Sequence, residues 1–188
     1  MLSAYKQKLS DIRQKIREMG LQSVVDVALF AIITLGLHLL WWNWLWKWET
    51  TGFLKLWADV LAHWVYLSSS WSLEHIFGFI HNGHNDTLFF NGTWIQIVPS
   101  CSGLKQFYQL FFLLLIFPGP WKHKLWYIPA GMILIFFVNV FRIVSLTYIM
   151  VWWPQHWDFA HLWILRPFYY VVIFVLWMVW VEKFWRRG

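Results

Sequence analysis

The chain of 188 residues is long enough for one domain, and its composition excludes a soluble one. Hydrophobic residues make up 60% of the sequence, aromatic residues 22% and charged residues 13%, and 18 residues are tryptophan. A soluble domain of this size could not hide so much apolar surface, and tryptophan favours membrane–water boundaries. The formal net charge of +6 collects in short basic patches, which is typical of membrane topology signals and not of nucleic-acid binding. We therefore expect a protein of the lipid bilayer.

The first 80 residues are expected to place one membrane crossing between two amphipathic segments. Residues 1–22 carry Lys and Arg at helical spacing without a signal-peptide core, which predicts a basic amphipathic helix on an anionic membrane surface. Residues 24–46 form the first predicted transmembrane helix. Residues 53–80 are apolar but interrupted by charges, which predicts one or two helices in or re-entering the outer interface, with a fifth crossing as the alternative. The membrane-buried face of this segment is expected to carry Phe53, Trp57, Leu61 and Trp64.

A small hairpin and three more crossings are expected in the rest of the chain. Asn91-Gly92 lies between strand formers, which predicts a β-hairpin over 86–98. The remaining transmembrane helices are expected over 101–117, over 127–150, where Pro129 suits the first turn, and over 161–183. The predicted fold class is a single-domain, all-α polytopic membrane protein with about four transmembrane helices, amphipathic interfacial helices and a small outer β-hairpin.

The basic patches predict the orientation in the membrane. They are the N-terminal helix, the pair Lys122 and Lys124, and the pair Arg186 and Arg187. Because Lys and Arg accumulate in cytoplasmic loops, all three patches and both termini are expected inside. Residues 81–103 and 149–161 are then expected on the outer face.

The single cysteine, Cys101, excludes an intramolecular disulfide and any site built from two cysteines. It is expected at the outer N-terminal end of a helix that begins near Leu104, where the helix dipole favours a nucleophilic thiolate. Ser102 and Gly103 follow it, and Lys105 adds positive potential one turn on. The alternative is that this cysteine is a small apolar filler.

Arg142 and two histidines are the other candidate site residues. A guanidinium inside an apolar helix costs about 2.5–3.5 kcal/mol, so Arg142 is expected to face the bundle interior, oriented by Asn139, unless it snorkels to the headgroups. His161 opens the last helix and can exchange protons near neutral pH. His156 is the alternative base, and Asp158 is expected to orient or cap either histidine.

These residues predict an acyl-transfer site on the outer face. The topology brings Cys101, Arg142 and His161 to the same boundary from three different helices. Cysteine would attack an amide carbonyl, arginine would hold the oxyanion, and histidine would protonate the leaving amine and then deprotonate the acceptor.

The sequence resembles the exosortase/archaeosortase family of integral-membrane sorting enzymes over about residues 80–184. The resemblance rests on Cys101-Ser102-Gly103-Leu104 after a glycine-containing hairpin, on the run from Asn139 to Ile143, and on His161. The family often has glycine four residues after its histidine, and this chain has Leu165 there. The overall length is similar to that of compact bacterial members.

This resemblance implies a cysteine protease or transpeptidase in the bacterial inner membrane that uses no cofactor and no metal. Its substrates would be exported proteins with a C-terminal tripartite sorting signal: a short motif, a transmembrane helix and a basic tail. The cleaved protein would pass to a surface glycan or lipid acceptor, and Cys101, Arg142 and His161 would be the catalytic residues.

Two other readings of the sequence stay open. A membrane helper or assembly subunit could bind haem or a metal, for which His81, His84 and Asp86 are the candidate ligands. A small transporter is the second, although it should show polar residues at the midplane and inverted repeats, and neither is clear.

Overall fold

The computed structural model describes residues 20–79, 82–90 and 92–185, so nearly all of the expected N-terminal helix lies outside the described residues, as do His81, Arg186 and Arg187. The fold is mostly helical with one small antiparallel sheet, which confirms the predicted fold class. Three described helices are long and apolar enough to cross a membrane, Gln22–Trp48, Trp121–Trp152 and Pro154–Trp185, and Leu104–Ile116 is a shorter apolar helix.

The first long helix consists of α2 (Gln22–Leu40), the π-helical turn η1 (Trp41–Leu45) and α3 (Trp46–Thr51). Three elements carry the chain toward the site: α4 (Phe53–His75), the strands β1 (Asn82–His84), β2 (Thr87–Phe90) and β3 (Thr93–Gln96), and the 3-10 turn η2 (Pro99–Cys101). The remaining helices are α5 (Leu104–Ile116), α6 (Trp121–Trp152), η3 (Pro154–His156), α7 (Trp157–Phe159), η4 (Ala160–Leu165), α8 (Arg166–Trp180) and η5 (Val181–Trp185).

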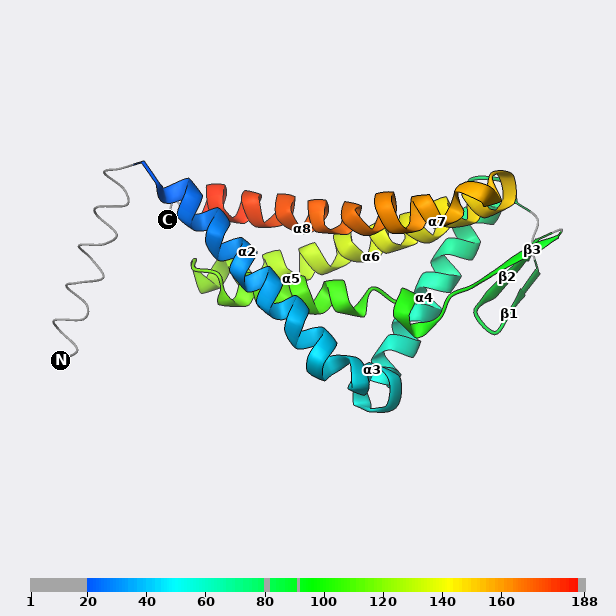
Figure 1. Cartoon of the computed structure of the whole chain (residues 1–188), viewed down its shortest axis with the longest axis horizontal. Coiled ribbons are helices and arrows are strands. Elements are labelled where there is room, and N and C mark those ends of the chain that lie inside the picture. Colours follow the sequence, from blue (N-terminus) through cyan, green and yellow to red (C-terminus); the bar gives the residue numbers. More distant parts are fainter. Residues whose placement is uncertain (1–19, 80–81, 91, 186–188) are drawn as a thin grey trace.

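The small sheet and the basic α5–α6 turn lie at opposite ends of the long axis of the molecule (Figure 1). In Figure 1 the start of α2, the turn between α5 and α6 and the end of α8 lie at one end of this axis. The sheet and α7 lie at the other end. The helices α6 and α8 run between the two ends, so they hold the sheet end and the basic α5–α6 turn well apart.

The amphipathic segment forms a single helix, α4. The side that packs on the protein carries mostly small residues, namely Ala58, Ala62, Val65, Ser69 and Leu73. Of the four residues expected on the membrane-buried face, Phe53, Trp57 and Trp64 are exposed on the protein surface, and Leu61 is half-buried and packs against the core. The small residues let α4 approach α6 closely, and the large rings point away from the protein.

The expected hairpin is present as β2 and β3, with Thr87 opposite Gln96 and Phe90 opposite Thr93. Gly92 in the two-residue connection has φ of 88°, as a tight hairpin turn requires. A third strand, β1, pairs antiparallel with β2 and was not predicted. Asn85 and Asp86 adopt positive φ and reverse the chain between them, a role that Asn and Asp fill more readily than other side chains.

The helix that was expected near Tyr127 begins earlier, at Trp121 after Pro120, so Pro129 lies inside it and not in its first turn. The reason lies in Lys124, which is buried and donates 2.8 Å hydrogen bonds to the carbonyls of Leu115 and Phe117. These carbonyls end α5, and a cation at a helix C-terminus satisfies both the hydrogen bonds and the dipole. The start of α6 is thus fastened to the end of α5.

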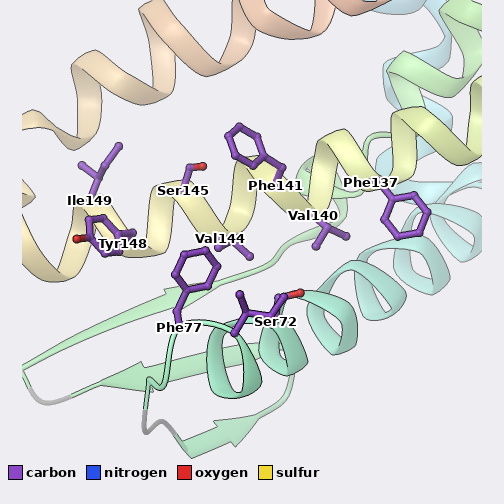
Figure 2. Close-up of a pocket in the computed structure, with 10 residues that line it drawn as sticks. Ser72, Phe77, Phe137, Val140, Phe141, Val144, Ser145, Tyr148 and Ile149 are labelled. Carbon is purple, nitrogen blue, oxygen red and sulfur yellow. The ribbon is translucent and has the colours of Figure 1, made fainter.

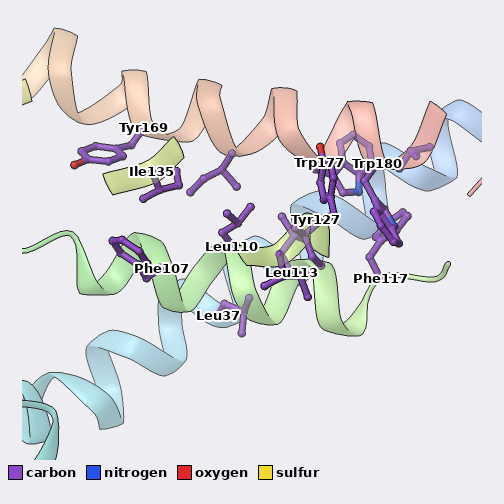
Figure 3. Close-up of a cluster of buried hydrophobic side chains, with 14 residues drawn as sticks. Leu37, Phe107, Leu110, Leu113, Phe117, Tyr127, Ile135, Tyr169, Trp177 and Trp180 are labelled. Carbon is purple, nitrogen blue, oxygen red and sulfur yellow. The ribbon is translucent and has the colours of Figure 1, made fainter. Parts of the chain in front are cut away.

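The main core joins α5, α6 and α8 through aromatic and aliphatic side chains (Figure 3). Trp180 is fully buried and donates a 3.0 Å hydrogen bond to the Pro118 carbonyl, and the Tyr127 hydroxyl donates to the Leu176 carbonyl at 2.7 Å. The bulk of this packing lies toward the α5–α6 turn. It fixes the relative heights of the three helices, and therefore of the polar residues at their other ends.

Candidate active site

Cys101 is the last residue of the η2 turn and not the first residue of a helix. Its amide donates to the Val98 carbonyl at 2.7 Å, and its free thiol is partly exposed. The helix expected from residue 101 starts at Leu104, because Gly103 has φ of 83° and interrupts the helical backbone. Ser102 is buried, and its hydroxyl accepts a 3.1 Å hydrogen bond from the Leu104 amide. The thiol therefore stands on a separate short turn in front of α5.

Asn139 ties this turn to two long helices. Its side chain is fully buried in α6, and its Nδ2 donates a 2.8 Å hydrogen bond to the Cys101 carbonyl. Its Oδ1 accepts a hydrogen bond from the Tyr169 hydroxyl of α8. An added Cβ on Gly103 would lie 3.0 Å from Asn139 Nδ2, so the absence of a side chain leaves room for this amide. The expected partner of Arg142 thus orients the cysteine backbone instead.

Arg142 lies one turn after Asn139 and contacts His161. A guanidinium nitrogen of Arg142 is 3.0 Å from His161 Nε2, and the Arg142 side chain is buried. Because a guanidinium only donates hydrogen bonds, Nε2 must accept, and the imidazole is neutral with its proton on Nδ1. The Arg142 Cζ lies 5.9 Å from the centre of the Tyr169 ring. Its Nε has no hydrogen-bond partner in the described part of the chain, so a donor is left over.

His161 lies in the π-helical turn η4, where the helix is wider than an α-helix. The Trp157 ring packs on it with the ring centres 4.8 Å apart. Leu165, at the position where the resembling family often has glycine, is buried at the end of this turn. Local π-helical turns often mark functional positions, and here the turn carries the imidazole that meets Arg142.

The other predicted site residues lie farther out. His156 ends the exposed η3 turn, and Asp158 is exposed in α7. Asp158 makes no hydrogen bond to either histidine among the described residues. Lys105 places its ammonium 4.7 Å from the centre of the Trp42 ring, on the side of α2 and η1.

Sequence reasoning missed Tyr169 and Trp157. Tyr169 is eight residues after His161, a spacing that returns to the same face of a helix, so its hydroxyl within an apolar run was the available signal. Trp157 gave no comparable signal, because tryptophan is common at membrane boundaries in any role. Both residues contact the Arg142–His161 pair through their rings.

An apolar cavity of about 500 Å³ lies beside this part of α6 (Figure 2). One wall is the end of α4 and the two residues after it, with Ser72, Ile76 and Phe77, and the other wall includes Val140, Phe141 and Val144 of α6. Val140 and Val144 also belong to the hydrophobic cluster against which Cys101 packs, so the cavity and the cysteine share these two neighbours on α6.

The metal ligands considered from the sequence are not gathered into a site within the described residues. No group of three His, Cys, Asp or Glu side chains able to hold a metal occurs there. Asp86 contacts His63 instead, with 2.7 Å between its Oδ1 and the imidazole Nδ1.

Comparison with known proteins gives one match. The family model described as transmembrane exosortase matches residues 19–182 of this chain. Searches of curated proteins and of solved structures gave no significant match. The matched range includes every described residue of the candidate site.

Proposed function

The chain belongs to the transmembrane exosortase family, and from this membership we propose that it cleaves the C-terminal tripartite sorting signals of exported proteins with Cys101 as nucleophile, Arg142 as oxyanion donor and His161 as acid and base. The family membership itself implies a multi-pass membrane protein that processes sorting-signal substrates as a transpeptidase. The assignment of residues depends mainly on one observation, the 3.0 Å contact between Arg142 and His161 beside the Asn139 that binds the Cys101 carbonyl.

The first half-reaction makes a thioester. His161 Nε2 takes the proton of the Cys101 thiol, and the sulfur attacks the carbonyl carbon of the motif. Arg142 turns its donors from Nε2 to the developing oxyanion, and its unpartnered Nε supplies a second donor. His161 then gives its proton to the leaving amine, the C–N bond breaks, and the tail of the signal departs.

The second half-reaction restores the cysteine. An acceptor hydroxyl or amine gives its proton to His161 and attacks the thioester carbonyl. The C–S bond breaks, and the sulfur recovers the proton. We propose a surface glycan or lipid as acceptor and the outer face of a bacterial inner membrane as the place of reaction. The apolar cavity between α4 and α6 supports a route for the apolar segment of the signal to reach Cys101.

The test is processing of a co-expressed substrate that carries a tripartite signal. Cys101→Ala should abolish processing, because no other described residue of the site offers a thiol, while the variant still inserts in the membrane at the wild-type level. Cys101→Ser should retain little activity, since a serine hydroxyl is a far weaker nucleophile than a thiolate. Undiminished processing by Cys101→Ala would remove the cysteine mechanism.

A further inference from the structure

A second cavity, of about 510 Å³, lies between α2 and α8. It follows η4 and α8 from Leu162 past Arg166 and Tyr170 to Phe174, and Phe30 of α2 faces it. It shares no lining residue with the cavity beside α6 and none with the candidate active site. The proposed reaction assigns no role to this cavity.

The cavity is lined mostly by apolar side chains, and Arg166 is the one charged residue of its lining. Arg166 is exposed, and it has no hydrogen bond or ion pair within the described residues. Eight residues on, about 12 Å along the helix, Phe174 meets Phe30 edge to face with their ring centres 5.2 Å apart. A cation exposed on a membrane-spanning helix is costly unless a partner neutralises it. The lining therefore favours a ligand with an anionic end and an apolar body.

A polar contact between α2 and α8 also involves a residue that lines this cavity. The Tyr170 hydroxyl lies 3.4 Å from His38 Nδ1 of α2. Arg166 forms no ion pair with a carboxylate in the described part of the chain, so its positive charge is available to an anionic ligand.

We propose that this cavity binds an anionic phospholipid, with the phosphate at Arg166 and one acyl chain lying along α8 toward Phe174 and Phe30. Charge complementarity selects an anionic occupant, and the apolar wall selects a lipid over a soluble phosphate. Phe30 and Phe174 contact each other at the far end of the lining from Leu162, and a flexible acyl chain fits so short an apolar stretch better than a peptide helix does.

The test is lipid retention by the full chain, delipidated in detergent and measured by native mass spectrometry. Wild type should bind phosphatidylglycerol in preference to phosphatidylcholine. Arg166→Gln should weaken phosphatidylglycerol binding about fivefold, the factor expected for one basic contact with an anionic lipid. Arg166→Lys should retain most of the binding. Val171→Trp, which fills the cavity and keeps the charge, should reduce it as Arg166→Gln does.

Lys55→Gln is the charge control, because it removes an exposed, ion-paired lysine of α4 that does not line this cavity, and it should bind phosphatidylglycerol as wild type does. Equal binding by wild type and Arg166→Gln would overturn the proposal. Displacement of the lipid by millimolar inorganic phosphate would overturn it too, since the site would then recognise a soluble anion. Loss of binding in Lys55→Gln would show a nonspecific charge effect.

Discussion

Without substrate, the contact of Arg142 with His161 blocks the imidazole nitrogen that is proposed to act as the base. The guanidinium occupies Nε2, which is the nitrogen that must take up a proton in the proposed reaction. A peptide carbonyl that drew Arg142 toward itself would free Nε2 and acquire an oxyanion donor in the same movement. Arrival of the substrate would thus activate the base and the electrophile together.

At the scale of single residues, an experiment can distinguish the roles of His161 and His156. His161→Ala should lower the processing rate about 100-fold or more, the usual contribution of a general acid or base. His156→Ala should leave the rate within about twofold, because His156 is exposed in η3 and lies outside the Arg142 contact. Cleavage of the tripartite substrate over time, normalised to inserted protein, measures both variants. Equal losses would contradict the assignment of His161.

The residues that a sequence can reveal are those that do not suit their surroundings. Arg142 stood out because a charge within an apolar run needs a reason, and Cys101 because it is unique. Tyr169 did not, since a tyrosine in an aromatic-rich chain is unremarkable until its hydroxyl is seen on Asn139. The bond from Asn139 to the Cys101 carbonyl also escaped, because it depends on how two helices are packed.

At the scale of elements, the site depends on an interrupted helix. Gly103 separates the η2 turn from α5 and leaves space for Asn139. Gly103→Ala should cost about 1–2 kcal/mol through its positive φ and should also push the Asn139 amide off the Cys101 carbonyl. We expect a lower melting temperature in detergent and a larger loss of processing than the stability change alone would cause.

Gly36→Ala is the control for that prediction. Gly36 lies inside α2, and an added Cβ there meets nothing within 4 Å. Alanine is the better helix former by about 1 kcal/mol, so the melting temperature should stay constant or rise, with full processing. A Gly103→Ala variant as active as Gly36→Ala would show that the left-handed turn does not serve the site.

A second prediction at this scale concerns the α5–α6 turn. Lys124→Met should leave the carbonyls of Leu115 and Phe117 without a donor, at a cost of about 1–3 kcal/mol. Lys122→Met removes the same charge from an exposed position and should leave the melting temperature unchanged. Thermal unfolding in detergent compares the two variants, and equal melting temperatures would exclude a capping role for Lys124.

Sequence patterns predicted the presence of helices and strands better than the residues at which they begin. The Asn91-Gly92 pair predicted its hairpin because the turn is local, whereas β1 depends on a reversal at Asn85 and Asp86 that has no comparably strong signal. Pro129 suggested a helix start, yet the helix begins at Trp121 because Lys124 fastens it to α5. Such contacts cross between elements and leave no periodicity in the sequence.

At the scale of the whole molecule, the orientation can now be argued with fewer charges. Lys124 is buried in a structural role, so Lys122 is the exposed cation of the pair on the α5–α6 turn. This turn and the end of α8 lie at one end of the long axis, opposite the sheet (Figure 1). If basic residues mark the cytoplasmic side, the sheet end and the candidate site face outward.

A cysteine-free background tests this orientation, because Cys101→Ala removes the only thiol in the chain. Single reporters at two exposed positions, His84→Cys in β1 and Lys122→Cys in α6, then mark the two ends. In cells whose outer membrane alone has been permeabilised, an impermeant maleimide should label His84→Cys. It should label Lys122→Cys only after the inner membrane has been permeabilised as well. Labelling of both after denaturation checks that each thiol is reactive. The reverse pattern would place the site on the cytoplasmic side, where exported proteins could meet it only before their transfer across the membrane.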